Sequence, residues 1–267
     1  MTDTKRKGAR SIKEIPPDIL NQLNRGEIET ANLVERLGIH PEILLENVLT
    51  QHNRKKYLKP ISEKINSLEK QTFMALCQVI VTGLYKQITT HNDNEFFQAI
   101  STHQSDLVRC RAACIIVEDS TLTIKQILEK MQPFATDRHF NVREVARSVM
   151  RKNIIQNLDE TLTILSKRAT NEDENIRRFA SEATRPRGVC CTHIKQLKEN
   201  PELALSILEP LKSDKSKYVQ NSVGNRLNDA SKTQPEFVRK LCQRWEKESN
   251  TEETKYIIKR ALRTIGE

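Results

Sequence analysis

The chain has 267 residues, 37% of them hydrophobic and 30% charged, so it is long enough to bury a core while keeping a polar surface. Its 7 glycines never cluster, which excludes the glycine-rich phosphate loops of nucleotide-binding enzymes, and few glycines and prolines argue against a turn-rich β-sandwich. The longest apolar run, residues 112–117, is too short to span a bilayer, and the charged N-terminus predicts no secretory signal.

The net charge of +9 is unevenly distributed along the chain. Residues 1–13 carry +4 and residues 139–232 carry +5, whereas residues 14–138 carry −2. A basic excess inside folded sequence is typical of a surface that binds a polyanion, although a solvated surface can have the same composition. We expect residues 1–13 to form a disordered basic tail.

The N-terminal third predicts short helices separated by glycine and proline. Candidate helices cover residues 18–23, 27–37 and 41–49, and residues 61–88 form one or two more, after a basic link at 53–60. We interpret residues 14–90 as a helical cap on the repeats that follow.

From residue 91 onward one pattern recurs. After a short polar turn, an apolar residue that is usually followed by Arg opens a helix, at Val108, Val142, Ile176, Val219 and, more loosely, Tyr256. The intervals between successive starts are 34, 34, 43 and 37 residues. Before each of the last four starts, the preceding helix is expected to end 11 residues earlier in the chain. Tetratricopeptide and ankyrin consensus residues are absent, so residues 91–267 predict HEAT-like repeats in one continuous all-α solenoid, whose concave face presents the second helix of each pair.

Basic residues recur in these second helices. A helix over 142–153 would place Arg143, Arg147 and Arg151 on one face, and later repeats add Arg177, Arg178, Arg185, Arg187 and Arg226. Arg forms a bidentate fork with phosphate, so we expect these eight residues to line a basic groove that follows a nucleic-acid backbone. Salt bridging within the repeats is the alternative interpretation.

Three carboxylates are embedded in the basic segment: Glu144, Glu182 and Asp229. A carboxylate among arginines stays ionised, which suits stabilisation of a developing positive charge better than general-acid catalysis. Most such side chains are simply partners of a surface Arg. Pro186 predicts that the helix carrying Glu182 ends near residue 184 or 185.

The six cysteines predict free thiols in a reducing compartment, because no secretory signal accompanies them. They are Cys77, Cys110, Cys114, Cys190, Cys191 and Cys242. None of their spacings matches a zinc site, and we expect neither a metal nor a cofactor.

Three motifs follow closely in the C-terminal half: IRRFASEATRPR at 176–187, LEPLKSD at 208–214 and SVGNRLND at 222–229. Together they resemble the AlkC branch of the AlkC/AlkD family of DNA alkylation-repair glycosylases. The resemblance covers about residues 160–265, and more weakly residues 105–160. It implies a HEAT-like repeat fold and excision of cationic alkylated purines, such as 3-methyladenine or 7-methylguanine, from double-stranded DNA by hydrolysis of the N-glycosidic bond.

The resemblance also implies roles for individual residues. Glu182 and Asp229 match acidic residues of the family's active site, Glu144 resembles a third acid, and Arg178 matches an arginine that contacts DNA. Cys190 stands where the family usually has a tryptophan that packs against the damaged nucleoside. Without that ring, a cationic lesion loses a cation–π partner, which predicts weaker excision but intact DNA binding.

Two other functions fit the same sequence. In the first, the chain is a HEAT-like scaffold that binds nucleic acid or protein and whose acids no longer catalyse a reaction; the replacement at Cys190 favours it. In the second, the chain is a protein-binding solenoid of the phycobilin-lyase kind, which the basic segment disfavours. In each case we expect a cytoplasmic monomer with no membrane partner.

Overall fold

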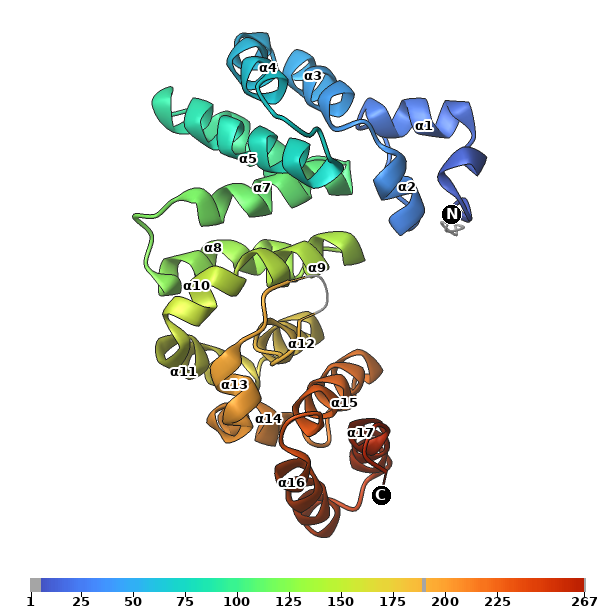
Figure 1. Cartoon of the computed structure of the whole chain (residues 1–267), viewed down its shortest axis with the longest axis vertical. Coiled ribbons are helices and arrows are strands. Elements are labelled where there is room, and N and C mark those ends of the chain that lie inside the picture. The colour runs from blue at the N-terminus through green and yellow to red at the C-terminus, as the bar shows by residue number, and fades with distance from the viewer. Residues whose placement is uncertain (1–5, 189–190, 267) are drawn as a thin grey trace. The chain divides into compact units, whose positions relative to one another are not determined.

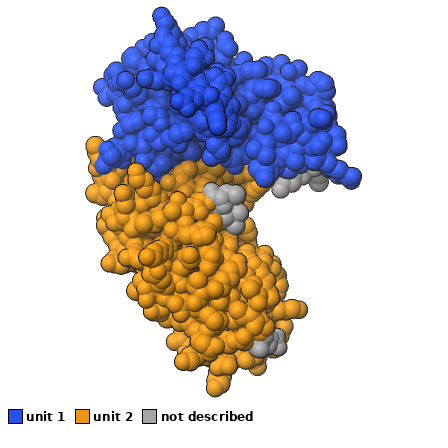
Figure 2. Space-filling model, viewed as in Figure 1, with its two compact units in different colours: residues 1–120 blue, residues 121–267 orange. Residues whose placement is uncertain are grey.

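The computed structural model describes residues 6–188 and 191–266, and all regular structure in these ranges is helical (Figure 1). The all-α prediction is therefore confirmed. The chain divides into unit 1, residues 1–120, and unit 2, residues 121–267 (Figure 2). Within the described ranges, no helix has the length and apolar character needed to cross a membrane.

Unit 1 consists of seven helices among its described residues, with 3-10 turns at Ile12–Glu14 and Lys55–Tyr57. The helices are α1 (Pro17–Asn24), α2 (Leu33–Gly38), α3 (Pro41–Gln51), α4 (Leu58–Asn66), α5 (Phe73–Thr90), α6 (Asn94–Ser101) and α7 (Asp106–Glu118). The candidate helices at 18–23, 41–49 and 61–88 are confirmed, the last as the pair α4 and α5. The predicted link at 53–60 is wrong in its second half, where α4 begins.

The helix predicted at 27–37 forms only from Leu33 onward. Thr30 instead donates from its backbone N–H and its hydroxyl to the two carboxylate oxygens of the buried Asp106, at 2.9 and 2.8 Å. These bonds hold residue 30 against the start of α7. Asn32 then caps the shortened helix, because its side chain accepts a hydrogen bond from the backbone N–H of Glu35.

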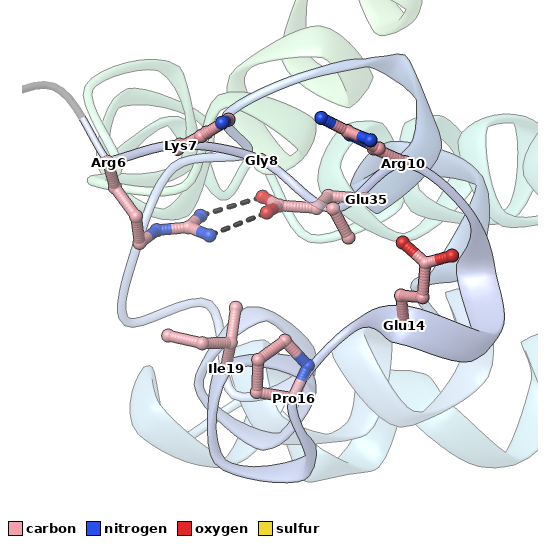
Figure 3. Close-up of a pocket in the computed structure, with 9 residues that line it drawn as sticks. Arg6, Lys7, Gly8, Arg10, Glu14, Pro16, Ile19 and Glu35 are labelled. Atoms are coloured by element: carbon pink, nitrogen blue, oxygen red, sulfur yellow. Dashed lines mark hydrogen bonds and ion pairs between the residues drawn. The ribbon is translucent and has the colours of Figure 1, made fainter.

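Residues 6–13, the part of the predicted tail that the structure describes, lie against α2. Arg6 forms a bidentate ion pair with the buried carboxylate of Glu35, at 2.5 and 2.6 Å (Figure 3). The side chain of Asn32 also donates to the backbone carbonyl of Ala9 at 2.8 Å. A shallow pocket of about 340 Å³ lies beside this pair. The described part of the tail is thus tied to unit 1 rather than free.

Unit 2 alternates first and second helices of successive pairs. Its helices are α8 (Ile124–Ala135), α9 (Phe140–Val149), α10 (Arg151–Gln156), α11 (Leu158–Arg168), α12 (Glu174–Ala183), α13 (Lys195–Glu199), α14 (Leu205–Leu208), α15 (Lys217–Ser231), α16 (Pro235–Glu248) and α17 (Glu252–Leu262). Two 3-10 turns, Pro201–Ala204 and Glu209–Leu211, interrupt the first helix of the third pair. This broken helix and the loop at 184–194 account for the long 43-residue interval.

The second helices of unit 2 pack against one another in chain order: α9 on α12, α12 on α15, and α15 on α17. We call these four helices the second-helix layer. Their first helices, α8, α11, α14 and α16, pack against this layer and, in part, against each other. The helix starts predicted at 142, 176, 219 and 256 are all confirmed, because an apolar stripe and a preceding polar turn are local signals.

Helix α12 illustrates how the layer is positioned. Ile176, Phe179, Ala180 and Ala183 recur at helical spacing and are buried, and each large apolar side chain contributes about 1.5–3 kcal/mol by leaving water. The side chain of Asp173 caps the N-terminus. The helix ends at Ala183, as the prediction from the following proline requires.

The predicted single helix over 142–153 is wrong. The structure has α9 ending at Val149 and α10 beginning at Arg151, with Met150 between them and completely buried. Arg147 and Arg151, on the two sides of this break, are both buried. The three arginines of the predicted ridge therefore do not lie on one continuous helix.

Candidate active site and nucleic-acid interface

Three neighbouring helices of the second-helix layer carry the three candidate acids. Glu144 lies on α9, Glu182 on α12 and Asp229 on α15. Ionic contacts connect them in a continuous row, which we call the charge ladder; in order, its members are Arg178, Glu144, Arg147, Glu182, Arg185, Asp229 and Lys232. The sequence placed these acids in different repeats, and the packing of the layer brings them together.

The first half of the charge ladder is centred on Glu144. Its Oε1 accepts a hydrogen bond from Arg178, and its Oε2 lies 2.5 Å from Nη2 of Arg147. Burial alone disfavours the charged form of Glu144, but Arg178 and Arg147 outweigh burial and lower its pKa. Glu144 is therefore a fixed negative charge at neutral pH.

Arg185 connects the other two acids. Its Nη1 lies 3.3 Å from Oε2 of Glu182, and its Nη2 lies 2.6 Å from Oδ2 of Asp229. Glu182 and Asp229 are only 4% and 5% exposed. Burial disfavours the charged guanidinium of Arg185, but the two carboxylates outweigh burial and raise its pKa.

Arg143 and Arg178 both contact a tyrosine on α15. Their guanidinium carbons lie 5.3 and 4.1 Å from the ring centroid of Tyr218. Arg143 also donates to the backbone carbonyls of Asp137 and Arg138, at 2.5 and 3.0 Å. This aromatic side chain was not among the sequence candidates, although it opens a second helix next to Val219.

Four of the arginines predicted to contact DNA are buried, namely Arg147, Arg151, Arg185 and Arg226. Arg151 and Arg226 are 3% and 2% exposed. Arg151 donates to the backbone carbonyls of Ala183, Arg185 and Thr192 at 2.8–2.9 Å, which holds the loop at 184–194. Arg226 donates to the Ser181 carbonyl and to the Thr184 hydroxyl. Both side chains bond to backbone carbonyls at the end of α12.

Arg177 and Arg187, also predicted to contact DNA, both lie outside the charge ladder. Arg177 forms a bidentate pair with the buried carboxylate of Asp214, at 2.6 and 3.0 Å. Arg187 is half-buried in the loop after α12, and its Nε has no hydrogen-bond partner among the described residues. Arg177 lies outside the charge ladder, so its pair with Asp214 provides an internal comparison for the ladder.

Cys190, at the family's tryptophan position, lies outside the described residues. Trp245 cannot replace that tryptophan from its own position, because it is completely buried on α16 and its indole N–H donates to Glu209 at 3.1 Å. Tyr218 is an aromatic side chain that contacts the charge ladder, through Arg178. Within the described residues, no three His, Cys, Asp or Glu side chains are grouped to hold a metal ion.

A polar groove of about 380 Å³ lies over α15, between α12 and α17. Its lining comprises Arg178, Glu182, Tyr218, Asn221, Ser222, Asn225, Tyr256 and Arg260. Glu182 is the one acid of the charge ladder in that lining. The asparagines and the α17 residues were not among the candidates from the sequence, although a regular spacing connects them. Asn221, Asn225 and Asn228 bond to residues 35 positions later, which are Tyr256, Arg260 and Arg263.

The fold and this site define a class: an all-helical repeat protein whose second helices combine buried acids with arginines. The chain matches the model of the DNA alkylation repair enzyme family over residues 49–265, and it belongs to that family. A curated relative, the uncharacterized protein YhaZ of Bacillus subtilis (strain 168), is 44% identical over 95 residues, which is 36% of this chain and 26% of YhaZ. The chain thus spans only part of that relative.

Solved structures show the same fold. The alkylpurine DNA glycosylase AlkC of Pseudomonas fluorescens, bound to DNA containing an abasic-site analogue, is 21% identical with a TM-score of 0.64, over 97% of this chain and 65% of AlkC. AlkD2 of Streptococcus mutans is 24% identical with a TM-score of 0.60, over 79% of this chain and 98% of AlkD2. The Streptococcus mutans UA159 protein smu.31 is 21% identical with a TM-score of 0.54, over 83% of this chain and 98% of smu.31.

Proposed function

We propose that this protein binds double-stranded DNA and hydrolyses the N-glycosidic bond of cationic alkylated purines of the 3-methyladenine and 7-methylguanine type. The observation that carries the proposal is the charge ladder, which pairs three carboxylates with arginines on neighbouring helices of a chain from the DNA alkylation repair enzyme family. No metal or cofactor enters the proposed chemistry.

The proposed chemistry needs fixed negative charge more than it needs a general acid. A purine alkylated at N3 or N7 is already cationic, so it leaves without protonation. The transition state has an oxocarbenium-like sugar, and carboxylates held in place before the reaction stabilise its positive charge with no reorganisation. Ion pairs with the neighbouring arginines hold the carboxylates of the ladder in place.

In this proposal the three acids have different roles, which follow from their positions. Glu182 lines the groove over α15, so its carboxylate faces the sugar. Asp229 has Oδ2 held by Arg185, while Oδ1 lies 3.4 Å from the partly exposed Lys232 and can orient the attacking water. Glu144 adds negative charge one helix earlier and fixes Arg178, which is expected to contact a phosphate.

Excision from methylated duplex DNA by the purified chain tests the proposal. Asp229→Asn leaves Arg185 an oxygen acceptor of the same size and removes the charge, so we expect release of 3-methyladenine or 7-methylguanine to fall by about a hundredfold or more. Asp214→Asn is the matched control, because it neutralises another buried aspartate paired with an arginine. Equal losses in the two variants would mean that Asp229 only maintains the fold.

A DNA-binding scaffold without excision activity is the second candidate function. It is favoured by Cys190 at the family's tryptophan position and by the ionic pairing of all three acids. In that case the unmodified chain binds duplex DNA and releases no base. Cys190→Trp then tests whether the missing ring is the cause, since restored release would return the chain to the first function.

A further inference from the structure

The groove over α15 is lined by hydrogen-bond donors. On α15, Asn221 Oδ1 accepts from the Tyr256 hydroxyl at 2.8 Å, and Asn225 Oδ1 accepts from Arg260 at 3.0 Å and Arg263 at 2.8 Å. Because each amide oxygen is directed at α17, each amide NH₂ group remains to donate. Within the described part of the chain, neither amide nitrogen has a hydrogen-bond acceptor.

A buried hydroxyl on the same helix also has no partner. Ser222 lines the groove and is 1% exposed, yet its Oγ makes no hydrogen bond among the described residues. The buried Nε of Arg260, which lines the same groove, is likewise without an acceptor. Buried polar atoms are rarely left unsatisfied, so two such donors at one groove indicate that an acceptor binds there.

The charges around the groove favour an anion. Arg178 and Arg260 line its two sides, from α12 and α17. The opposing charge is Glu182, and its Oε2 is already shared between Arg185 at 3.3 Å and Arg147 at 3.8 Å. Charged and neutral N–H and O–H groups therefore outnumber the acceptors, which is the composition of an oxyanion site.

We propose that this groove is a seat for a phosphate group, held by Asn221, Ser222 and Asn225 with Arg178 and Arg260 on its flanks. A phosphate bound in this seat would fix the DNA backbone beside Glu182. The assignment of that phosphate to DNA rests on the proposed function, whereas the phosphate site itself does not. A free phosphate has the same chemistry and could fill the same seat.

Two variants test whether Asn225 and Ser222 donate hydrogen bonds to a ligand or serve only to maintain the fold. Asn225→Asp keeps an oxygen acceptor for Arg260 and Arg263 while replacing the NH₂ donor with negative charge. Ser222→Ala removes a hydroxyl that has no partner among the described residues, so a purely structural role predicts unchanged binding and equal or higher stability. Gln243→Glu, exposed on α16, is the control because it introduces the same charge change as Asn225→Asp.

The measurements are the affinity for undamaged duplex DNA and the side-chain amide NMR signals of Asn221 and Asn225 during titration with duplex or inorganic phosphate. We expect both ligands to shift these signals. We expect Asn225→Asp and Ser222→Ala to weaken duplex binding about tenfold, while Gln243→Glu changes it less than twofold.

Each outcome decides the inference. Shifts with inorganic phosphate but unchanged duplex affinity in both variants support a seat for free phosphate and reject the DNA backbone as its occupant. If neither ligand shifts the side-chain amide signals of Asn221 and Asn225, the proposed phosphate seat is wrong, even if the unmodified chain excises bases normally. Conversely, the chain could shift its amide signals with phosphate and yet neither bind DNA nor release bases. That result would support the seat and reject the proposed function.

Discussion

At the residue scale, Arg185 determines the electrostatics of the candidate site because it lies between two buried carboxylates. Removing one partner of a buried ionic network leaves charge without compensation, which costs more than the network contributes as a whole. The same reasoning predicts that the effect of neutralising Asp229 depends on whether Arg185 is present.

We expect Arg185→Met to lower the free energy of unfolding by about 3–5 kcal/mol. Asp229→Asn should destabilise the unmodified chain but stabilise the Arg185→Met variant, because there it removes a buried charge whose remaining partner is the more exposed Lys232, 3.4 Å away. Urea unfolding of the four chains of this double-mutant cycle measures the coupling. Additive effects would show that the two side chains act independently.

A second residue-scale prediction concerns His103 in unit 1. Burial, together with nearby His52 and Arg109, lowers the pKa of His103 to about 4, and its Nδ1 accepts the backbone N–H of Ser105. The unfolded chain binds this proton near pH 6.5, so between pH 6.5 and 4 the unfolded state holds more protons and stability falls as pH falls. The loss attributable to this partly exposed ring is about 1–2 kcal/mol.

Thermal unfolding between pH 7 and 4 measures this contribution. His103→Gln should flatten the curve in that window, whereas His193→Gln, which changes an exposed histidine in unit 2, should leave it as it is. An unchanged pH dependence in His103→Gln would assign the acid sensitivity to other groups.

At the element scale, the loop after α12 depends on one side chain of α10. The guanidinium of Arg151 bonds three backbone carbonyls on both sides of the loop, and Arg185 belongs to that loop. Lys has a single ammonium group on a flexible stem and cannot reproduce the planar fork. The position of Arg185 relative to Glu182 and Asp229 thus depends on Arg151.

We expect Arg151→Lys to reduce base excision at least about tenfold while changing undamaged-DNA affinity less, since misplacement of the site affects the reaction more than backbone contacts. Single-turnover excision and DNA binding measured together test this. Arg168→Lys is the control, because Arg168 also donates to a backbone carbonyl, that of Leu128, but on a first helix. A similar loss in both variants would contradict a specific role for Arg151.

The elements that local patterns define were predicted well, and those that distant contacts define were not. Helix α12 has a buried stripe, a cap and a proline stop in its own sequence. The helix expected at 27–37 was shortened by Thr30 bonding to Asp106, 76 residues away. No window around residue 30 contains that information.

At the scale of the whole molecule, the basic excess of unit 2 is largely paired internally. Arg147, Arg177 and Arg185 each contact a carboxylate, and Arg151 and Arg226 are buried. Fewer arginines are therefore available to phosphates than the eight that the sequence suggested. This changes the expected salt dependence of DNA binding.

We expect the logarithm of the DNA association constant to fall with the logarithm of salt concentration with a slope of about −3 to −5, as for about three to five phosphate contacts. Fluorescence anisotropy with duplexes of unrelated sequence measures the slope, which should not depend on sequence. A slope steeper than about −7 would mean that the paired arginines exchange their carboxylates for phosphates.

The sequence by itself determined the helical class, the starts of the second helices in unit 2, the end of α12 and the identity of the candidate acids. Each of these depends on periodicity, a breaker or a motif within a few residues. Tertiary structure decided which arginines face outward, that Arg185 joins Glu182 to Asp229, and that Asn221 and Asn225 line a groove with Arg260. Those properties depend on how each helix packs against its neighbour. The bonds from Arg151 to the carbonyls of Ala183 and Arg185, more than 30 residues away, show why, because no local pattern contains them.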